Sequence, residues 1–190
     1  MYESFLGKMV EVASRYKIGN PLDEATDIGT LIGRDQFEKV CGYIEDGLSQ
    51  EEARVMIGGM PPAEGPLTRG YYMPPTIFAG AKHDWRLARE EIFGPVLVVI
   101  PWKDEADVIR MTNDSIYGLS GHVWTYNIGT ALRTAHAIES GWIQVNLRSG
   151  TLPGHSYGGY KQSGVGTEFS LESMLDGLTH RKVVTVNLAR

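Results

Sequence analysis

The sequence predicts an α/β fold in which an open, mostly parallel sheet is flanked by helices. Residues 96–102 form a continuous apolar run, as expected for a strand that is covered on both faces. Two segments with apolar residues at helical spacing follow this run, and each of them is followed by a short strand pattern. Strands that alternate with helices in this way pair in parallel through right-handed crossovers.

The first half of the chain contains two predicted helices and a short strand. Gly19-Asn20-Pro21 ends the first helix and opens a turn-rich stretch, and Gly47 is expected to stop the second helix. Gly58-Gly59 ends the strand. The segment 60–75 holds five of the nine prolines and is predicted to be a surface excursion. The predicted elements of this half are helices at residues 3–17 and 35–46, a strand at 54–57 and an extended segment at 76–78.

The second half has a more regular alternation of strands and helices. Asp104 is predicted to cap one helix with its short polar side chain, and Asn127 begins a second predicted helix. A glycine-rich loop follows Asn146 and extends to Gly166. The valine-rich strand at the carboxyl end offers a pairing edge if it is exposed. The predicted strands lie at residues 96–102, 120–125, 142–145 and 182–188, and the helices at 104–112, 127–139 and 169–175.

Composition and charge exclude several classes of function. The chain has 190 residues, 42% of them hydrophobic, and a chain of this size buries roughly 70% of its unfolded surface. The net charge is −5 and no basic stripe with interleaved aromatics is found, so no nucleic-acid partner is expected. No apolar run approaches the roughly 18 residues of a membrane span, so no membrane partner is expected. A single cysteine cannot form an internal disulfide, which fits the reducing cytoplasm.

The most informative motif is Glu90-Glu91-Ile92-Phe93-Gly94-Pro95-Val96, where Gly-Pro before a strand makes a fixed turn. Two interpretations are open. The carboxylates accept both hydroxyls of a ribose while the ring lies against a flat cofactor, or the segment is a solvated acidic turn with its phenylalanine in the core. The chemistry of these residues alone favours the second interpretation, because acidic residues are mostly exposed.

This motif resembles the Glu-Glu-Ile-Phe-Gly-Pro segment of the aldehyde dehydrogenase family. Other segments resemble that family as well, in the same order, and together they span nearly the whole chain. Each of them is weak by itself, but the ordered set makes the resemblance specific. The segments are Tyr2-Glu3-Ser4-Phe5, Gly19-Asn20-Pro21-Leu22-Asp23, Thr26-Asp27-Ile28-Gly29, Pro75-Thr76-Ile77-Phe78, Asn113-Asp114-Ser115-Ile116-Tyr117-Gly118-Leu119, Gly141-Trp142-Ile143-Gln144-Val145-Asn146 and Gly158-Gly159-Tyr160-Lys161-Gln162-Ser163-Gly164.

The resemblance implies functions for residues in two loops. In the family the second glutamate of the pair holds the nicotinamide ribose, and the phenylalanine two residues later packs near the nicotinamide. These positions correspond to Glu91 and Phe93 in this chain. The loop after Val-Asn shapes the aldehyde entrance in the family, which places Leu147, His155 and Tyr157 in the expected substrate pocket.

Other features of the sequence have simpler interpretations. The family usually has Pro-Phe before its paired glycines, whereas this chain has Ser156-Tyr157, so the serine is expected to loosen the turn and the tyrosine to line the pocket. The segment Gly158–Gly164 lacks the order of a phosphate-binding loop and is expected to form a tight backbone corner. Of the five histidines, which show no metal-ligand spacing, only His155 lies in the expected substrate loop, where a surface role is the simpler interpretation. Cys41 lies on the apolar face of a predicted helix and is expected to be an inert packing residue rather than a nucleophile.

The resemblance implies the oxidation of an aldehyde to a carboxylic acid with NAD or NADP. In the family a cysteine thiolate attacks the carbonyl carbon, a hydride passes to the nicotinamide, and a glutamate-activated water releases the acid. The nucleophile, the base, the oxyanion asparagine and the dinucleotide turn precede this segment in the family, and no matching motif is found in these 190 residues. We therefore expect residues 1–178 to be the carboxy-terminal part of a catalytic domain that contains no catalytic residue and is inactive by itself.

The last residues imply an assembly. In the family the tail strand joins a sheet that is shared between subunits, so residues 179–190 are expected to be an oligomerisation strand of a homo-oligomer. An alternative function is a non-catalytic assembly module that pairs with a full-length relative or with a separate amino-terminal polypeptide. A third hypothesis is split-enzyme complementation, in which mixing with the missing half restores turnover.

Overall fold

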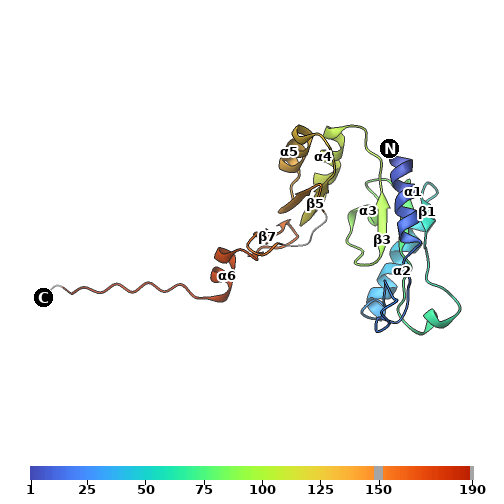
Figure 1. Cartoon of the computed structure of the whole chain (residues 1–190), viewed down its shortest axis with the longest axis horizontal. Coiled ribbons are helices and arrows are strands. Elements are labelled where there is room, and N and C mark those ends of the chain that lie inside the picture. Colours follow the sequence, from blue (N-terminus) through green and yellow to red (C-terminus); the bar gives the residue numbers. More distant parts are fainter. Residues whose placement is uncertain (148–151, 189–190) are drawn as a thin grey trace. The chain divides into compact units, whose positions relative to one another are not determined.

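The computed structural model describes residues 1–147 and 152–188, and the chain divides into two compact units (Figure 1). The amino-terminal unit is Met1–Trp102 and the carboxy-terminal unit is Lys103–Arg190. Within the described ranges, no helix is long and apolar enough to cross a membrane. The elements of the amino-terminal unit are α1 (Tyr2–Ala13), α2 (Arg34–Ser49), β1 (Arg54–Ile57), the 3-10 helix η1 (Pro66–Arg69), β2 (Thr76–Ala79), α3 (Arg86–Arg89) and β3 (Val96–Val99). Those of the carboxy-terminal unit are α4 (Glu105–Asn113), β4 (Tyr117–Gly118), β5 (Ser120–Val123), α5 (Ile128–Ala137), β6 (Trp142–Val145), β7 (Tyr157–Gly158), β8 (Tyr160–Lys161), β9 (Thr167–Glu168) and α6 (Leu171–Leu178).

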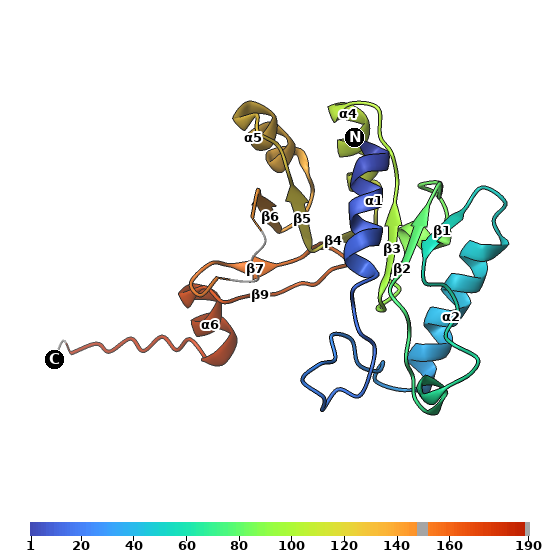
Figure 2. The same ribbon diagram turned by 45° about the vertical axis from the view of Figure 1, so that its right-hand side comes forward.

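The amino-terminal unit is built around a three-stranded sheet with the order β1-β2-β3. β1 pairs antiparallel with β2, whereas β2 and β3, which are joined by a connection containing α3, pair in parallel. Alternate residues of β2 point to opposite faces of this sheet. Phe78 packs into a cluster with residues of α2, and Ile77 packs into a second cluster with Leu6 of α1. The two helices therefore cover opposite faces of the sheet (Figure 2).

The strand that is covered on both faces is β2, and the prediction that the run from Val96 has this position is wrong. All four residues of β2 are buried, because it lies between two strands and between two helices. Among the described residues β3 pairs only with β2, and its Leu97 is 41% exposed. β3 also ends at Val99 instead of residue 102, since Pro101 has no backbone N–H with which to extend a ladder.

The sequence predicts that Gly47 stops α2, and this prediction is wrong. Gly47 lies buried inside the helix. A Cβ atom at this position would come within 2.8 Å of the Phe78 ring and 2.9 Å of Leu87 Cδ2. The absence of a side chain is therefore a packing requirement. Glycine lets α2 approach β2 and α3 closely, and this contact outweighs the low helix propensity of glycine.

Within its described residues the carboxy-terminal unit contains three two-stranded sheets. β5 and β6 are parallel and are joined by α5, which confirms the predicted alternation of strand and helix. The sequence predicts a loop for residues 147–166, but parts of it form short antiparallel pairs, β7 with β9 and β8 with β4. Pairs of two residues are too short to leave a periodic signal in a sequence. The fold class is α/β as predicted, with small sheets and flanking helices.

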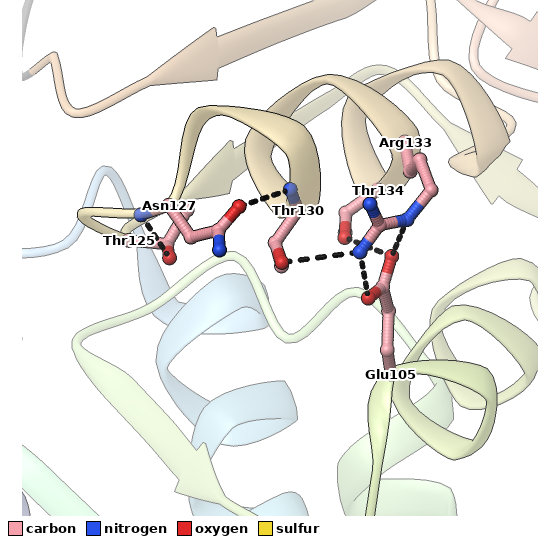
Figure 3. Close-up of polar contacts among 6 residues, drawn as sticks. All are labelled: Glu105, Thr125, Asn127, Thr130, Arg133 and Thr134. Carbon is pink, nitrogen blue, oxygen red and sulfur yellow. Dashed lines mark hydrogen bonds and ion pairs between the residues drawn. The ribbon is translucent and has the colours of Figure 1, made fainter.

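Polar side chains fix the start of α5 and its contact with α4 (Figure 3). Asn127, at which the sequence predicts that a helix begins, caps α5, since its side-chain oxygen accepts from the Thr130 N–H at 2.9 Å. The Arg133 guanidinium donates to both carboxylate oxygens of Glu105, at 3.3 and 2.9 Å. The Thr134 hydroxyl donates to the same carboxylate at 3.3 Å. One carboxylate from α4 is therefore bound by two side chains of α5.

We expect the contact between α4 and α5 to weaken in acid. The Arg133 guanidinium holds the pKa of the Glu105 carboxyl below its ordinary value. A carboxyl with a lowered pKa stabilises the folded state above its unfolded pKa of about 4.3, and this contribution is lost as the pH falls through the lower folded value. Amide-exchange protection of α4 and α5 should therefore fall on acidification in the native chain and fall less in Glu105→Gln. An equal fall in both proteins would show that the pair does not connect the helices.

Residues 181–188 follow α6 as an extended segment that belongs to no strand pair among the described residues (Figure 1). The side chains of Val183 and Leu188 are 91% and 87% exposed. The sequence predicts a strand at 182–188, but the ladder is not formed because no described strand lies alongside to exchange backbone hydrogen bonds. The oligomerisation strand at 179–190 therefore stays a prediction that requires a second chain.

Candidate functional site

The motif singled out in the sequence lies in the amino-terminal unit, in the connection from α3 to β3, and residues 90–95 are called the acidic loop below. The loop is tied to the sheet at its end, because the Thr76 N–H donates to the Pro95 carbonyl oxygen at 2.8 Å. Its start is continuous with α3, where the Glu90 N–H donates to the Arg86 carbonyl oxygen at 3.0 Å. Both ends of the acidic loop are therefore fixed by the backbone.

The first carboxylate of the acidic loop is paired with side chains of α2 and α3. Glu90 accepts from the Tyr43 hydroxyl at 2.7 Å and from Arg86 Nε at 3.1 Å. These two hydrogen bonds, that from Tyr43 first, hold the pKa of the Glu90 carboxyl below its ordinary value. Burial, followed by the hydrogen bond to Glu90, raises the pKa of Tyr43. Glu90 is thus an ionised anchor between α3 and α2.

The second carboxylate is presented outward. Glu91 is exposed, and no described residue pairs with its carboxylate. Its backbone is nevertheless held, because Lys39 Nζ donates to the Glu91 carbonyl oxygen at 3.1 Å. A carboxylate that is free to accept hydrogen bonds, on a backbone that cannot drift, is suited to bind a pair of hydroxyl groups.

The aromatic ring of the acidic loop is also presented outward. Phe93 is 72% exposed, whereas the core residue of the motif is Ile92, which is 7% exposed. The interpretation of this segment as a turn with a core phenylalanine is therefore wrong. Phe93 has a φ of 58°, a left-handed backbone that is uncommon for residues other than glycine and asparagine. Strained backbones of this kind cluster at ligand sites.

A hollow of about 340 Å³ lies beside β6 in the carboxy-terminal unit. The imidazole of His155 and the indole of Trp142 both line it and lie tilted to each other, with ring centroids 6.5 Å apart. The predicted pocket residues Leu147 and His155 both line the hollow, while residues 148–151 of the same predicted loop lie outside the described residues. The described lining consists of Gly141, Trp142, Ile143, Gln144, Val145, Leu147, Leu152, His155 and Ser156.

The third predicted pocket residue, Tyr157, lies behind this wall. Its ring packs edge-on against Trp142, with centroids 5.2 Å apart, and against Phe169 on another side, at 6.0 Å. The structure therefore brings Leu147 and His155 to the hollow, and Tyr157 supports the indole that lines it. The serine that replaces the usual proline, Ser156, is itself part of the lining.

Cys41 and the histidines form no second reactive centre among the described residues. The Cys41 thiol is partly buried and packs against the hydrophobic cluster of α2. Burial, followed by the charge of Glu45, raises the pKa of this thiol, which lowers its thiolate fraction. In the described ranges, no group of three or more histidine, cysteine, aspartate or glutamate side chains is placed to hold a metal ion.

Comparison with known proteins shows the family to which this chain belongs. The model of the aldehyde dehydrogenase family matches residues 1–184 of the chain. The chain belongs to the aldehyde dehydrogenase family. An aldehyde dehydrogenase of Vibrio cholerae serotype O1 is 41% identical over 170 residues, which are 88% of this chain and 33% of the relative. The chain thus spans about a third of the length of the curated relatives it matches.

Solved aldehyde dehydrogenases have the same fold over this part. A mutant of the Bacillus cereus enzyme is 37% identical with a TM-score of 0.89, over 99% of this chain and 37% of that protein. The Mycobacterium tuberculosis enzyme, solved in complex with NAD+, is 38% identical with a TM-score of 0.84, over 90% of this chain and 35% of that protein. This chain therefore corresponds to roughly one third of a dehydrogenase of this family.

The residues of this aldehyde dehydrogenase segment that hold the acidic loop carry no motif in the sequence. They are Gln36, Lys39 and Tyr43, which project from one side of α2 at positions i, i+3 and i+7. These three positions border the apolar face of the helix. Polar residues at such positions normally mark only the edge between the buried and the solvent-exposed face, so their spacing alone does not indicate a role. Their partners lie 47 to 57 residues away along the chain, and only the fold pairs them.

Proposed function

We propose that this chain supplies the nicotinamide-ribose side of the cofactor site, and part of the aldehyde entrance, in an NAD(P)-dependent aldehyde dehydrogenase. The complete enzyme oxidises an aldehyde to a carboxylic acid. One observation carries the proposal: Glu91 and Phe93 are both exposed on a loop whose backbone is tied to α2. The NAD complex of the Mycobacterium tuberculosis relative supports the choice of cofactor.

The two side chains fit the two parts of a nicotinamide nucleoside. The Glu91 carboxylate accepts hydrogen bonds from both ribose hydroxyls. The Phe93 ring offers a flat apolar surface against which the nicotinamide ring packs. The cofactor, when bound, supplies the hydride acceptor of the reaction. The contribution of this chain is orientation, since holding both sugar and ring determines which face of the nicotinamide meets the aldehyde.

The hollow beside β6 forms part of the aldehyde entrance in this proposal. Its described wall is mostly aromatic and aliphatic, with Gln144 and Ser156 as polar members, and the imidazole of His155 is the one titratable group in that lining. Leu147 and His155 contact the substrate, while Tyr157 sets the position of the Trp142 ring. Such a wall receives the apolar body of an aldehyde and excludes water from it.

Nicotinamide riboside binding tests the cofactor part of the proposal. We expect the riboside, titrated into the isotope-labelled chain, to shift the NMR signals of the acidic loop with a weak, roughly millimolar Kd, as a fragment of a cofactor binds. Glu91→Gln removes the charge from the acceptor and should weaken binding about tenfold. Glu64→Gln, at an exposed site of the same unit, is the matched control and should bind as the native chain does. Equal binding by native chain and Glu91→Gln would exclude Glu91 as the ribose ligand.

We further propose that the chain has no turnover by itself. Its single cysteine is Cys41, whose packing and raised pKa do not suit a nucleophile. Purified chain mixed with NAD and an aldehyde should therefore produce no NADH absorbance. Addition of the amino-terminal two thirds of a close relative tests complementation. Turnover by the purified chain alone would overturn the proposal of inactivity, and its loss in Cys41→Ser would identify Cys41 as the nucleophile.

A second candidate function is that of an assembly module, which is favoured by the apolar surface at the carboxyl end. Leu171, Leu178 and Val183 are 68%, 79% and 91% exposed, and they continue along α6 into the extended tail. Exposed apolar surface of this kind marks sites of protein association. Sedimentation velocity of the full chain and of residues 1–178 distinguishes the outcomes. A folded full chain that stays monomeric at micromolar concentration argues against this function.

A further inference from the structure

The acidic loop rests on one side of α2, and Gln36 of this helix hydrogen-bonds to two successive residues of the loop. Gln36 Nε2 donates to the carbonyl oxygens of Ile92 and Phe93, both at 2.9 Å. The side-chain nitrogen has to be the atom that faces the loop, because the amide oxygen cannot donate to two carbonyl oxygens. One side chain therefore binds two successive peptide groups.

Those two peptide groups are the ones that flank the Cα of Phe93. The Ile92 carbonyl belongs to the peptide plane before this Cα, and the Phe93 carbonyl belongs to the plane after it. A donor that holds both planes fixes φ and ψ of Phe93 together. The left-handed φ of 58° requires such support, since its free-energy cost for an L-residue is of the same order as the contribution of two neutral hydrogen bonds.

The surroundings leave the loop little freedom to satisfy these bonds in another way. A Cβ atom on Gly94 would lie 2.7 Å from a methyl carbon of Val40, one turn after Gln36 on α2. Glycine thus allows the loop to lie directly on the helix. Ile92, which precedes Phe93 as Gly94 follows it, is buried in the same cluster as Val40 and anchors the loop there. Between these two fixed neighbours, Phe93 is the residue that turns outward.

We propose that Gln36 is a positioning residue of the cofactor site, which holds Phe93 in the left-handed conformation and thereby presents the Phe93 ring and the Glu91 carboxylate together. The consequence for cofactor binding rests on the function proposed above. The structural step, from Gln36 to the backbone of Phe93, does not depend on it. Gln36 touches neither cofactor nor substrate in this proposal and acts through the acidic loop.

The structural step is tested by reading φ of Phe93 from its HN–Hα coupling and Cα chemical shift in the labelled full chain. The native chain should show the left-handed values. Gln36→Leu keeps the size of the side chain and removes the donor, so Phe93 is expected to lose the left-handed signature while α2 keeps its helical shifts. A folded Gln36→Leu chain in which Phe93 stays left-handed overturns the proposal.

Gln36→Glu supplies a reversible form of the same test. Near neutral pH its carboxylate presents only acceptors to two carbonyl oxygens, so the left-handed signature should be absent. Acidification protonates this carboxylate, whose ordinary pKa is about 4.3 and which the two carbonyl oxygens are expected to raise. The protonated form has one O–H donor and should restore part of the signature. A purely structural role for the side-chain volume predicts no such pH dependence. A Phe93 conformation that is independent of pH in this variant contradicts the proposal.

Nicotinamide riboside titration tests the functional step. Gln36→Leu should bind the riboside about tenfold more weakly than the native chain, from the loss of two neutral hydrogen bonds that orient the loop. Gln162→Leu, an exposed glutamine of the other unit, is the matched control and should bind as the native chain does. If native chain binds no riboside, the proposed function fails while the Phe93 measurement still decides the role of Gln36. If Phe93 changes conformation and affinity does not, Gln36 has no positioning role.

Discussion

Replacing Gly141 with alanine is expected to unfold much of the carboxy-terminal unit. A Cβ atom at this position would lie 1.8 Å from the Gly158 carbonyl oxygen and 2.9 Å from the carbonyl carbon. Both atoms belong to the backbone, so no side-chain rotation relieves the clash. Residue 141 is itself held in place, because its N–H donates to the Gly118 carbonyl oxygen at 3.0 Å. Overpacking usually costs 1–3 kcal/mol, and we expect about 3 kcal/mol or more here.

Hydrogen exchange resolved by mass spectrometry measures this effect in each unit separately. Gly141→Ala should lose protection in β6 and β7, while the helices and strands of the amino-terminal unit keep theirs. Gly177→Ala is the matched control, since no atom lies within 4 Å of a Cβ at that position in α6. Alanine there should leave protection unchanged or raise stability by up to about 1 kcal/mol. Equal protection in both variants would mean that a side chain at position 141 is tolerated beside the Gly158 backbone.

The backbone corner that Gly158 and Gly159 form against Gly141 also explains why both residues before Tyr160 are glycines. A Cβ atom on Gly158 would lie 2.7 Å from Thr167 Cγ2, and one on Gly159 would lie 2.5 Å from Ser163 Cβ. This agrees with the tight backbone corner that the sequence predicts for this segment. The corner stands next to β6, whose first residue, Trp142, lines the hollow. A change that opens the corner should therefore also disturb the proposed aldehyde entrance.

Features that depend on neighbouring residues could be predicted from the sequence. Asp104 accepts from the Asp107 N–H at 2.9 Å, as its predicted capping role requires, because a cap is formed within one helical turn. The strand β6 has the predicted bounds, since an apolar run between two turns determines both of its ends. Residues 60–75 contain the predicted excursion, with a short 3-10 helix in place of a longer element. The acidic loop was located in the same way, because its motif is a run of consecutive residues.

Features that depend on distant residues could not be predicted. Gly47 reads as a helix stop until Phe78, 31 residues later, is known to occupy the space beside it. The adjacent glutamates look equivalent in the sequence, and only the fold shows that the Glu90 carboxylate is paired with Tyr43 and Arg86 whereas the Glu91 carboxylate is not. The exposure of Phe93 depends in the same way on a glutamine 57 residues earlier. The proposed site residues follow from the motif, whereas the residues that hold their loop could be recognised only from the fold.

Replacing Phe78 with alanine is expected to remove most of the stability of the amino-terminal unit. Phe78 is fully buried at the centre of the cluster between β2 and α2. Its ring lies directly against Gly47, so α2 has no side chain there that could turn into the cavity. Deleting a buried phenylalanine costs about 3–5 kcal/mol, which is a large share of the 5–15 kcal/mol that usually separates a folded domain from its unfolded state.

The loss should extend to the proposed cofactor site, because Ile92 of the acidic loop belongs to the same cluster as Phe78. Urea unfolding followed by circular dichroism measures the change in stability, and the NMR signals of Phe93 report the loop. Phe78→Leu fills part of the cavity and should lie between the native chain and Phe78→Ala in both measurements. Ile32→Ala, at a side chain that is 98% exposed in the same unit, should shift the midpoint little. If Phe78→Ala unfolds at the midpoint of Ile32→Ala, the cluster does not support α2. The acidic loop would then need another source of rigidity, because the side chains that hydrogen-bond to it here, Gln36, Lys39, Tyr43 and Arg86, project from that helix or from α3.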